Sequence, residues 1–371
     1  MHVHRVELVD FRNYEQLTLD LTPGCSFFLG PNGSGKTNLL EAIRVIACGR
    51  SHRGARDSDM VRLGRPGYRI AVAALGRQEA LELDLVWKRG QSRRLRLNGV
   101  PVERMADALG RLPVVIFSPG ELELVQGGPV GRRRYLDLLL CQLFPAYYDR
   151  WLTYQRVLLQ RNRLLIQSRG DPHPGEREVW DGSLVEAGLP LAAYRQELAA
   201  QLAGVLPALH ARLVGAAEAL KVEYQPGVSG PPASLRNGDE WMAAYRQQLV
   251  HARPLERRRR LTLIGPHRDD LAISWQGRNL RTFASQGQQR MAALAMKLAE
   301  VQLLRRQAGE EPVLLLDDVL SELDSSRRAV LLDFLAEGGQ TLITAAALGG
   351  AIRADDSARF YHVEAGQVRG G

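Results

Sequence analysis

Apolar and polar residues alternate in several short segments of the N-terminal hundred residues, and this period of two is typical of half-buried β-strands. The segments are separated by residues that favour turns, such as Pro23-Gly24 and Asn98-Gly99. We therefore predict two N-terminal strands followed by an antiparallel sheet. The predicted strands are residues 3–9, 17–21, 68–74, 80–87 and 93–97.

Other segments are continuously apolar, which is typical of strands buried on both faces of a sheet. The most apolar of them is 312–316, and its composition predicts a place in the middle of a parallel sheet. The predicted core strands are 25–29, 113–117, 312–316 and 339–344, and we predict that the last strand is 358–364. A further strand is predicted at 270–275.

In the middle of the chain the apolar residues recur every three to four positions, which predicts helices. The stretches 132–168 and 176–219 predict two long antiparallel helices in a helical lobe or short arm. Pro190 and Pro207 predict kinks or breaks in the second. No heptad repeat is sustained long enough for a long coiled coil. Shorter helices are predicted at 239–251 and 288–306.

The composition is that of a soluble globular protein, with 371 residues, 45% hydrophobic and 24% charged, and the length suggests about two lobes. All but four of the 49 basic residues are arginine, and the net charge of +8 favours a polyanionic partner. The three cysteines form no CxxC pair, which argues against a structural zinc site and fits a reducing cytosol. Because the sequence has neither an apolar leader nor a segment of membrane-spanning length, we expect a cytoplasmic protein without a membrane partner.

One predicted strand carries a row of arginines on its outer face. In 93–97 the leucines face the core and Arg94 and Arg96 face outward. This row is either a contact for DNA phosphates or an ordinary solvated strand face.

A glycine-rich segment between the predicted strand 25–29 and a predicted helix matches the phosphate-binding P-loop, G-x-x-x-x-G-K-T. Gly33 and Gly35 allow the backbone to curl so that several N–H groups point at one anion. We predict that Lys36 reaches the β- and γ-phosphates of ATP and that Thr37 ligates Mg²⁺. The predicted ATP-binding segment consists of Gly30, Pro31, Asn32, Gly33, Ser34, Gly35, Lys36 and Thr37.

The predicted strand 313–316 ends in two carboxylates, Asp317 and Asp318. Beside a P-loop, we predict that Asp317 holds Mg²⁺ and that Asp318 polarises the attacking water. Asp318 and Lys36 are the predicted catalytic residues. The alternative is a simple turn. Arg12 and Asn13, between the first two strands, either approach the nucleotide or form a solvated turn.

The segment 285–290, SQGQQR, resembles the signature of ABC-type ATPases, and 321–324 resembles their D-loop. Thr344 lies where those ATPases place a switch histidine. The resemblance implies that Ser285, Gly287 and Gln288, at a helix N-terminus, bind the γ-phosphate of the ATP held by a second subunit. Two heads would then enclose two ATP molecules under two-fold symmetry.

Motifs across residues 8–324 are similar to those of the RecF family, within the SMC/Rad50-like ABC-type ATPases. They are LVDFRNYEQL, GPNGSGKTNLLEAI, GRSHRGARD, VVIFSPGELELVQGGPVGRRRYLD, GPHRDDL, SQGQQR and LLLDDVLSELD. The resemblance implies an α/β ABC-type ATPase head with mixed and antiparallel sheets. Residues 1–120 and 261–371 would form the ATPase lobe, and 121–260 a helical lobe without a long coiled coil.

The family resemblance also implies a function. We expect ATP-driven dimerisation on DNA without sequence preference, at duplexes and at gaps with single-strand junctions. Slow DNA-stimulated ATP hydrolysis and recombinase loading with RecO and RecR are further expectations.

Two departures from the pattern of ABC-type ATPases affect the site. No clear Q-loop glutamine is present, and Ser118 and Glu121 lie near its place; Asp318 replaces the more usual glutamate. We interpret the polar motif Gly265–Asp270 as a structural cluster of polar side chains and not as part of the catalytic site.

Three alternative functions are weighed against this prediction. They are a non-catalytic DNA scaffold with ATP as a structural ligand, an ABC transporter ATPase subunit and, less suited to 285–288, a small-molecule kinase.

Overall fold

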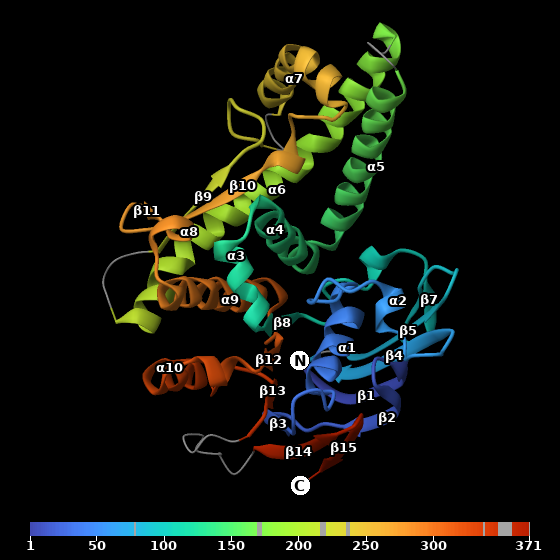
Figure 1. The fold of residues 1–371 in the computed structure, drawn as a ribbon, viewed down its shortest axis with the longest axis vertical. Helices are drawn as coiled ribbons and strands as arrows, with labels where there is room; N and C mark the ends of the chain where they lie inside the picture. Colours follow the sequence, from blue (N-terminus) through green and yellow to red (C-terminus); the bar gives the residue numbers. More distant parts are fainter. Residues whose placement is uncertain are drawn as a thin grey trace. The chain divides into compact units, whose positions relative to one another are not determined.

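The computed structural model describes residues 1–77, 79–168, 173–215, 220–234, 238–336, 338–347 and 358–370 (Figure 1). The chain forms two compact units. Unit 1 comprises Met1–Leu122, Ala211–Ala216 and Ala293–Gly371, and unit 2 comprises Glu123–His210 and Ala217–Ala292. Residues 261–292, which the sequence analysis groups with the ATPase lobe, therefore cluster with unit 2.

The first sheet of unit 1 is antiparallel, in the order β2-β1-β4-β5-β6-β7. Alternate residues of its strands are buried, so the period of two in the sequence matches the two faces of the sheet. On β6, Leu95 is buried and Arg94 and Arg96 are exposed. The strands are β1 (His2–Phe11), β2 (Tyr14–Asp20), β4 (Gly67–Leu75), β5 (Ala80–Lys88), β6 (Arg94–Leu97) and β7 (Val100–Val102).

The second sheet of unit 1 is mixed, in the order β15-β14-β3-β13-β12-β8. Its strands from β14 to β8 are parallel, and the central β12 is buried along its whole length, as its apolar composition predicts. β15 pairs antiparallel with β14 and follows the strand that we predicted to be the last. The strands are β3 (Cys25–Leu29), β8 (Val114–Phe117), β12 (Val313–Asp317), β13 (Thr341–Ala345), β14 (Arg359–Glu364) and β15 (Gln367–Gly370).

One apolar core joins the two sheets of unit 1. The helix α1 (Lys36–Cys48) contributes Leu39, Ile43 and Ile46, which pack with residues of both sheets. Because α1 begins in the P-loop, this core fixes the helix that carries the phosphate-binding turn. The other elements of unit 1 are α2 (Asp57–Met60), η1 (Met105–Asp107), η2 (Pro119–Leu122), η4 (Val319–Glu322) and α10 (Ser325–Ala336).

Unit 2 is mainly helical. The predicted helix 132–168 is two helices, since Pro145 starts a new one after Phe144. Neither Pro190 nor Pro207 is a break, since both prolines lie inside the continuous helix α6. The kinks that were the other possibility at these positions stay a prediction. Residues 216–219, at the end of that prediction, lie outside the described residues. The helices are α3 (Glu123–Gln126), α4 (Pro129–Leu143), α5 (Pro145–Gln167), α6 (Pro174–Val214), α7 (Asp239–Arg259), η3 (Pro266–Arg268) and α8 (Leu280–Phe283).

A small antiparallel sheet in the order β11-β10-β9 completes unit 2. The sequence predicted β10 but missed β9, which pairs with it along the length of both strands. The helix α9 (Gln286–Ala308) begins in unit 2 and continues in unit 1. The strands are β9 (Leu220–Gln225), β10 (Asp270–Trp275) and β11 (Arg278–Asn279).

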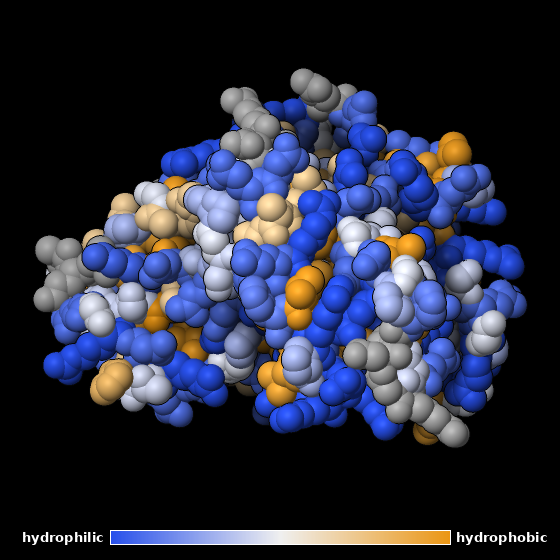
Figure 2. Space-filling view, turned by 90° about the horizontal axis from the view of Figure 1, so that it is seen from above, coloured by the Kyte–Doolittle hydropathy of each residue, from blue (hydrophilic) through white to orange (hydrophobic). Residues whose placement is uncertain are grey.

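The molecular surface is mainly hydrophilic on the face drawn in Figure 2, where apolar residues are scattered among polar ones. Such scattered apolar residues are usual on protein surfaces. Among the described residues, the helices are too short or too polar to cross a bilayer.

Candidate functional site

The P-loop connects the end of β3 to the start of α1, and two of its glycines are required by their surroundings. Gly30 has a φ of 158°, and a Cβ there would lie 2.1 Å from the carbonyl oxygen of Val363. Gly35 has a φ of 122°, and a Cβ would lie 2.7 Å from Nδ2 of Asn13. A larger residue would displace the loop at both positions, so the glycines allow the close approach of neighbouring backbone and side chains.

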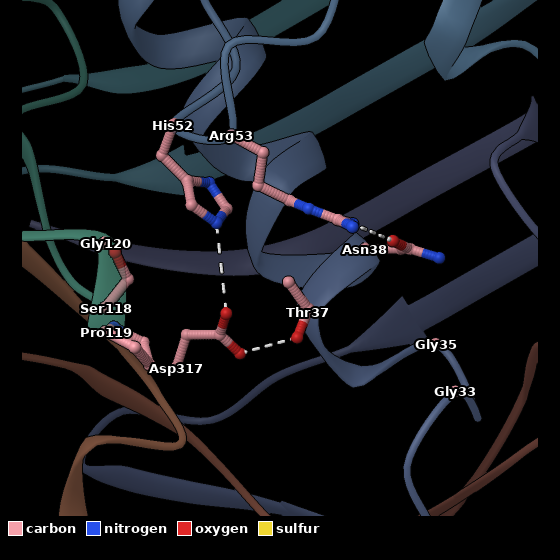
Figure 3. A pocket seen from close by; sticks show the side chains of 10 residues that line it. All are labelled: Gly33, Gly35, Thr37, Asn38, His52, Arg53, Ser118, Pro119, Gly120 and Asp317. Carbon is pink, nitrogen blue, oxygen red and sulfur yellow. Dashed lines mark hydrogen bonds and ion pairs between the residues drawn. The ribbon is translucent and has the colours of Figure 1, made fainter.

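A pocket of about 440 Å³ opens beside this loop in unit 1 (Figure 3). Its lining combines glycines of the P-loop, the first turn of α1, the loop after α1, the segment after β8 and the end of β12. The residues are Gly33, Gly35, Thr37, Asn38, His52, Arg53, Ser118, Pro119, Gly120 and Asp317.

Thr37 and Asp317, the two predicted metal ligands, lie together in this pocket. The hydroxyl of Thr37 donates to Oδ1 of Asp317 at 2.7 Å, and the hydroxyl of Thr344 lies 2.9 Å from the same oxygen. Burial favours the neutral carboxyl, but the polar contacts of His52, Thr37 and Thr344 outweigh it and lower the pKa of Asp317. A hydroxyl and an ionised carboxylate are suitable oxygen ligands for Mg²⁺.

Asp318 follows Asp317 in a left-handed backbone conformation, with a φ of 53°. Its N–H donates to the Thr344 hydroxyl at 3.0 Å. Burial raises the pKa of its carboxyl, the charge of Asp317 adds to this and Lys36 opposes it. A raised pKa makes a carboxylate a better proton acceptor, as polarising water requires.

Lys36 is buried, and its ammonium donates to the carbonyl oxygens of Gly30 and Pro31 at 2.7 and 3.0 Å. Both acceptors belong to the P-loop, so the ammonium lies over the loop that would hold the phosphates. Within the same loop Ser34 has a buried hydroxyl without a hydrogen-bond partner, and Asn32 is exposed.

Arg12 and Asn13 are not in the lining of the pocket, although the sequence made them candidates for binding nucleotide. The guanidinium of Arg12 donates to both oxygens of Glu41, on α1, and to the carbonyl of Asp59. The Asn13 amide donates to the Ser34 carbonyl and accepts from Asn38. Arg12 and Asn13 therefore bind residues of the P-loop and of α1, and neither lines the pocket.

Ser285, Gly287 and Gln288 lie in unit 2, around the start of α9. The Ser285 N–H donates to Oε1 of Gln288 at 2.8 Å, and the Gln288 N–H donates to the Ser285 hydroxyl at 3.3 Å, which forms a reciprocal cap. Ser285 is exposed. The turn is therefore accessible to a group from outside its own unit, as the prediction requires.

Sequence reasoning missed several pocket residues. His52 and Arg53 belong to the segment GRSHRGARD, which the sequence offered only as a family motif, and nothing in the local sequence showed that these two residues line the pocket beside the P-loop. Ser118, near the expected Q-loop, does line the pocket, whereas Glu121 is not in its lining.

The motif Gly265–Asp270 forms a buried polar cluster in unit 2. Asp269 accepts from Arg195 and Tyr224 at 2.7 Å each, and burial raises the pKa of its carboxyl. Asp270 accepts from Arg132 at 2.6 Å. These contacts join α4, α6 and the small sheet, which supports the structural interpretation of the motif.

The P-loop after β3, then the capped turn before α9 and then the carboxylate at the end of β12 follow one another along the chain in the order typical of an ABC-type ATPase head. The chain belongs to the RecF family of this class: the model of the "RecF/RecN/SMC N terminal domain" matches residues 2–369. This confirms the predicted α/β fold.

Curated relatives cover nearly the whole chain. "DNA replication and repair protein RecF" of Symbiobacterium thermophilum is 41% identical over 99% of this chain and 98% of its own length. The protein of the same name from Acetivibrio thermocellus is 35% identical over 93% of each.

Solved structures of related proteins have a similar fold. "Structure of the recombination mediator protein RecF-ATP in RecFOR pathway" has a TM-score of 0.92 and 29% identity, covering 100% of this chain and 97% of that one. An Smc head domain from Pyrococcus furiosus, with a TM-score of 0.54 and 16% identity over 100% of this chain and 96% of its own, shares the fold.

Proposed function

We propose that this protein is an ATP-dependent DNA-binding protein of recombinational repair, with slow DNA-stimulated ATPase activity. ATP with Mg²⁺ binds at Lys36, Thr37 and Asp317. The contact that carries the proposal is the 2.7 Å hydrogen bond between Thr37 and Asp317, since it brings two oxygen ligands together beside the P-loop. The relatives named for DNA replication and repair support the biological setting.

ATP acts in this proposal as the ligand that couples dimerisation to DNA binding. The exposed cap of α9 on one subunit closes on the γ-phosphate held by the P-loop of the other. Asp318 polarises the attacking water, and hydrolysis reopens the dimer. The protein acts in the cytoplasm at gapped DNA with RecO and RecR, in keeping with the RecFOR pathway named for its structural relative.

Sedimentation with and without ATP, and with gapped DNA, tests nucleotide binding and dimerisation together. Lys36→Met should abolish ATP binding, because the phosphates lose their cation. Ser285→Arg should bind ATP as the wild type does but remain monomeric, because a long cation replaces the small cap at the interface. Ser229→Arg, at an exposed position between β9 and α7, makes the same substitution elsewhere and is the matched control, which should still dimerise with ATP.

ATP-driven dimers of the Ser285→Arg variant would refute the composite site. Phosphate release separates the catalytic proposal from the scaffold alternative: release at the buffer background, with and without DNA, would leave ATP as a structural ligand. Recovery of the protein in the membrane fraction would favour the transporter alternative.

A further inference from the structure

His52 is a buried polar side chain without a hydrogen bond in the nucleotide pocket. Its side chain is 7% exposed, and both ring nitrogens are buried and lack a partner within hydrogen-bond distance. The Asp317 carboxylate faces the ring, with Oδ2 3.9 Å from Nε2, which is too long for a hydrogen bond. Buried polar groups without partners are uncommon in folded proteins, so this ring is placed to meet a ligand.

The orientation of His52 is set by its neighbours. Ser51 donates to Oε1 of the buried Glu41 at 2.5 Å and accepts from the Arg53 N–H at 3.0 Å. The Arg53 side chain donates to Asn38, on the first turn of α1, at 3.2 Å. The residues on both sides are therefore tied to α1 or to each other, and the imidazole faces Asp317 at the 3.9 Å of the ion-pair contact drawn in Figure 3, without a hydrogen bond.

The two oxygens of Asp317 have different surroundings. Oδ1 is occupied by the hydroxyls of Thr37 and Thr344. Oδ2 faces His52 across the pocket. A neutral imidazole offers one donor and one acceptor, and a water bound to Mg²⁺ can donate to both a carboxylate and a ring nitrogen. Mg²⁺ usually keeps several waters when it binds protein carboxylates.

We propose, on the basis of the proposed ATP-binding function, that His52 is a positioning residue for the metal: its Nε2 accepts a hydrogen bond from a Mg²⁺-bound water that also contacts Oδ2 of Asp317. His52 would thereby orient that water from the loop after α1. It supplies an imidazole to this pocket from the loop after α1, while the Thr344 hydroxyl is committed to Asp317 and to the Asp318 backbone.

The proposal is tested by titrating fluorescent ATP with the full chain at several Mg²⁺ concentrations and in EDTA. His52→Leu keeps a similar bulk but has no polar atom, so it should raise the Mg²⁺ concentration for half-saturation about tenfold, the low end for losing an outer-shell partner. Its affinity for ATP in EDTA should not change. His52→Gln restores an acceptor and should recover most of the Mg²⁺ dependence. His362→Gln, on the exposed face of β14, is the matched control.

The outcomes separate the possibilities. A Mg²⁺ dependence in His52→Leu equal to that of the wild type would overturn the proposal. So would equal losses of ATP affinity in EDTA and in Mg²⁺, because His52 would then support the nucleotide or the fold and not the metal. Thermal melting of the nucleotide-free variants detects damage to the fold. A wild-type protein that binds no ATP at any Mg²⁺ concentration would instead refute the proposed function.

Discussion

Glu41 is a fully buried carboxylate on α1, the helix that follows the P-loop. The charge of this carboxylate is balanced by the guanidinium of Arg12. Arg12 donates to both of its oxygens, at 2.8 and 2.7 Å. Burial alone would raise the pKa of Glu41, but the hydrogen bonds from Arg12 and Ser51 outweigh it and lower the pKa. The carboxylate is therefore charged in the fold and needs its partner.

We predict that Arg12→Ala lowers the free energy of unfolding by about 3–5 kcal/mol, because it leaves a buried charge unpaired. Arg12→Ala combined with Glu41→Met should recover much of the loss, since the charge is then absent. Chemical denaturation of the nucleotide-free protein measures both. Arg5→Ala, which breaks an exposed pair with Glu7, should cost less than about 1 kcal/mol.

A large loss of ATP affinity in Arg12→Ala with unchanged stability would contradict this structural role and favour direct nucleotide binding. The sequence placed Arg12 near the P-loop but did not reveal its acceptor, which lies 29 residues further along the chain. His52 was missed as a pocket residue because Asp317, the carboxylate that it faces, is also distant in the sequence. A motif identifies the loop that binds phosphate, whereas the side chains opposite it depend on how distant segments pack.

At the scale of elements, the sequence predicted strands and helices better than it predicted their breaks. Pro190 lacks an N–H and should interrupt a helix, yet α6 continues through it. Two residues earlier, a Cβ on Gly188 would lie 3.1 Å from Tyr245 and 3.4 Å from Trp241, both on α7. This close packing of α6 on α7 is a tertiary contact of the kind that overrides local propensity, and it leaves no periodic signal in the sequence of α6.

His267 links α5 to the segment before η3. Its Nε2 lies 3.0 Å from the Thr262 carbonyl, which can only accept, so Nε2 carries the proton and Nδ1 accepts from the Tyr154 hydroxyl at 2.7 Å. Burial lowers the pKa of His267 to about 4, although the hydrogen bond to Thr262 opposes this. The folded protein thus holds this histidine neutral.

This contact predicts a loss of stability in mild acid. An unfolded histidine titrates near 6.5, so between about pH 6.5 and pH 4 the unfolded chain binds a proton that the folded chain does not. The free energy of unfolding should therefore fall as the pH is lowered, by about 2 kcal/mol at about pH 5 from this group. Urea denaturation at about pH 7.5 and pH 5 can be followed by tryptophan fluorescence, since Trp151, Trp180, Trp241 and Trp275 lie in unit 2.

His267→Gln keeps a donor and an acceptor but does not titrate, so it should lose less stability between the two pH values than the wild type. His251→Gln, at an exposed position of α7, should behave as the wild type does. An equal loss in all three proteins would show that other groups govern the acid response.

At the scale of the whole molecule, the net charge of +8 and the family membership both favour a nucleic-acid partner. Composition alone does not decide which arginines contact DNA, because most of the 49 basic residues are equal candidates on that basis. Arg94 and Arg96 form one testable pair: both are exposed on β6, and the buried Leu95 between them places both side chains on the same face of the strand.

We predict that the ATP-bound protein binds duplexes of unrelated sequence with similar affinity and that binding weakens steeply with salt, because phosphate contacts release counterions. About six to ten such contacts would lower the affinity by about 10³–10⁵ between 50 and 200 mM salt. Fluorescence anisotropy with labelled duplexes in the presence of ATP measures how the logarithm of the affinity falls with the logarithm of the salt concentration. In the double variant Arg94→Glu/Arg96→Glu, the plot of log affinity against log salt concentration should have a shallower slope, by the amount that about two phosphate contacts contribute. Arg258→Glu with Arg259→Glu, at exposed positions of α7, changes the net charge equally and serves as the control. Equal weakening by the two pairs would mean that net charge, and not the row on β6, attracts the DNA, whereas a shallower slope for the β6 pair alone would assign the contact to that strand.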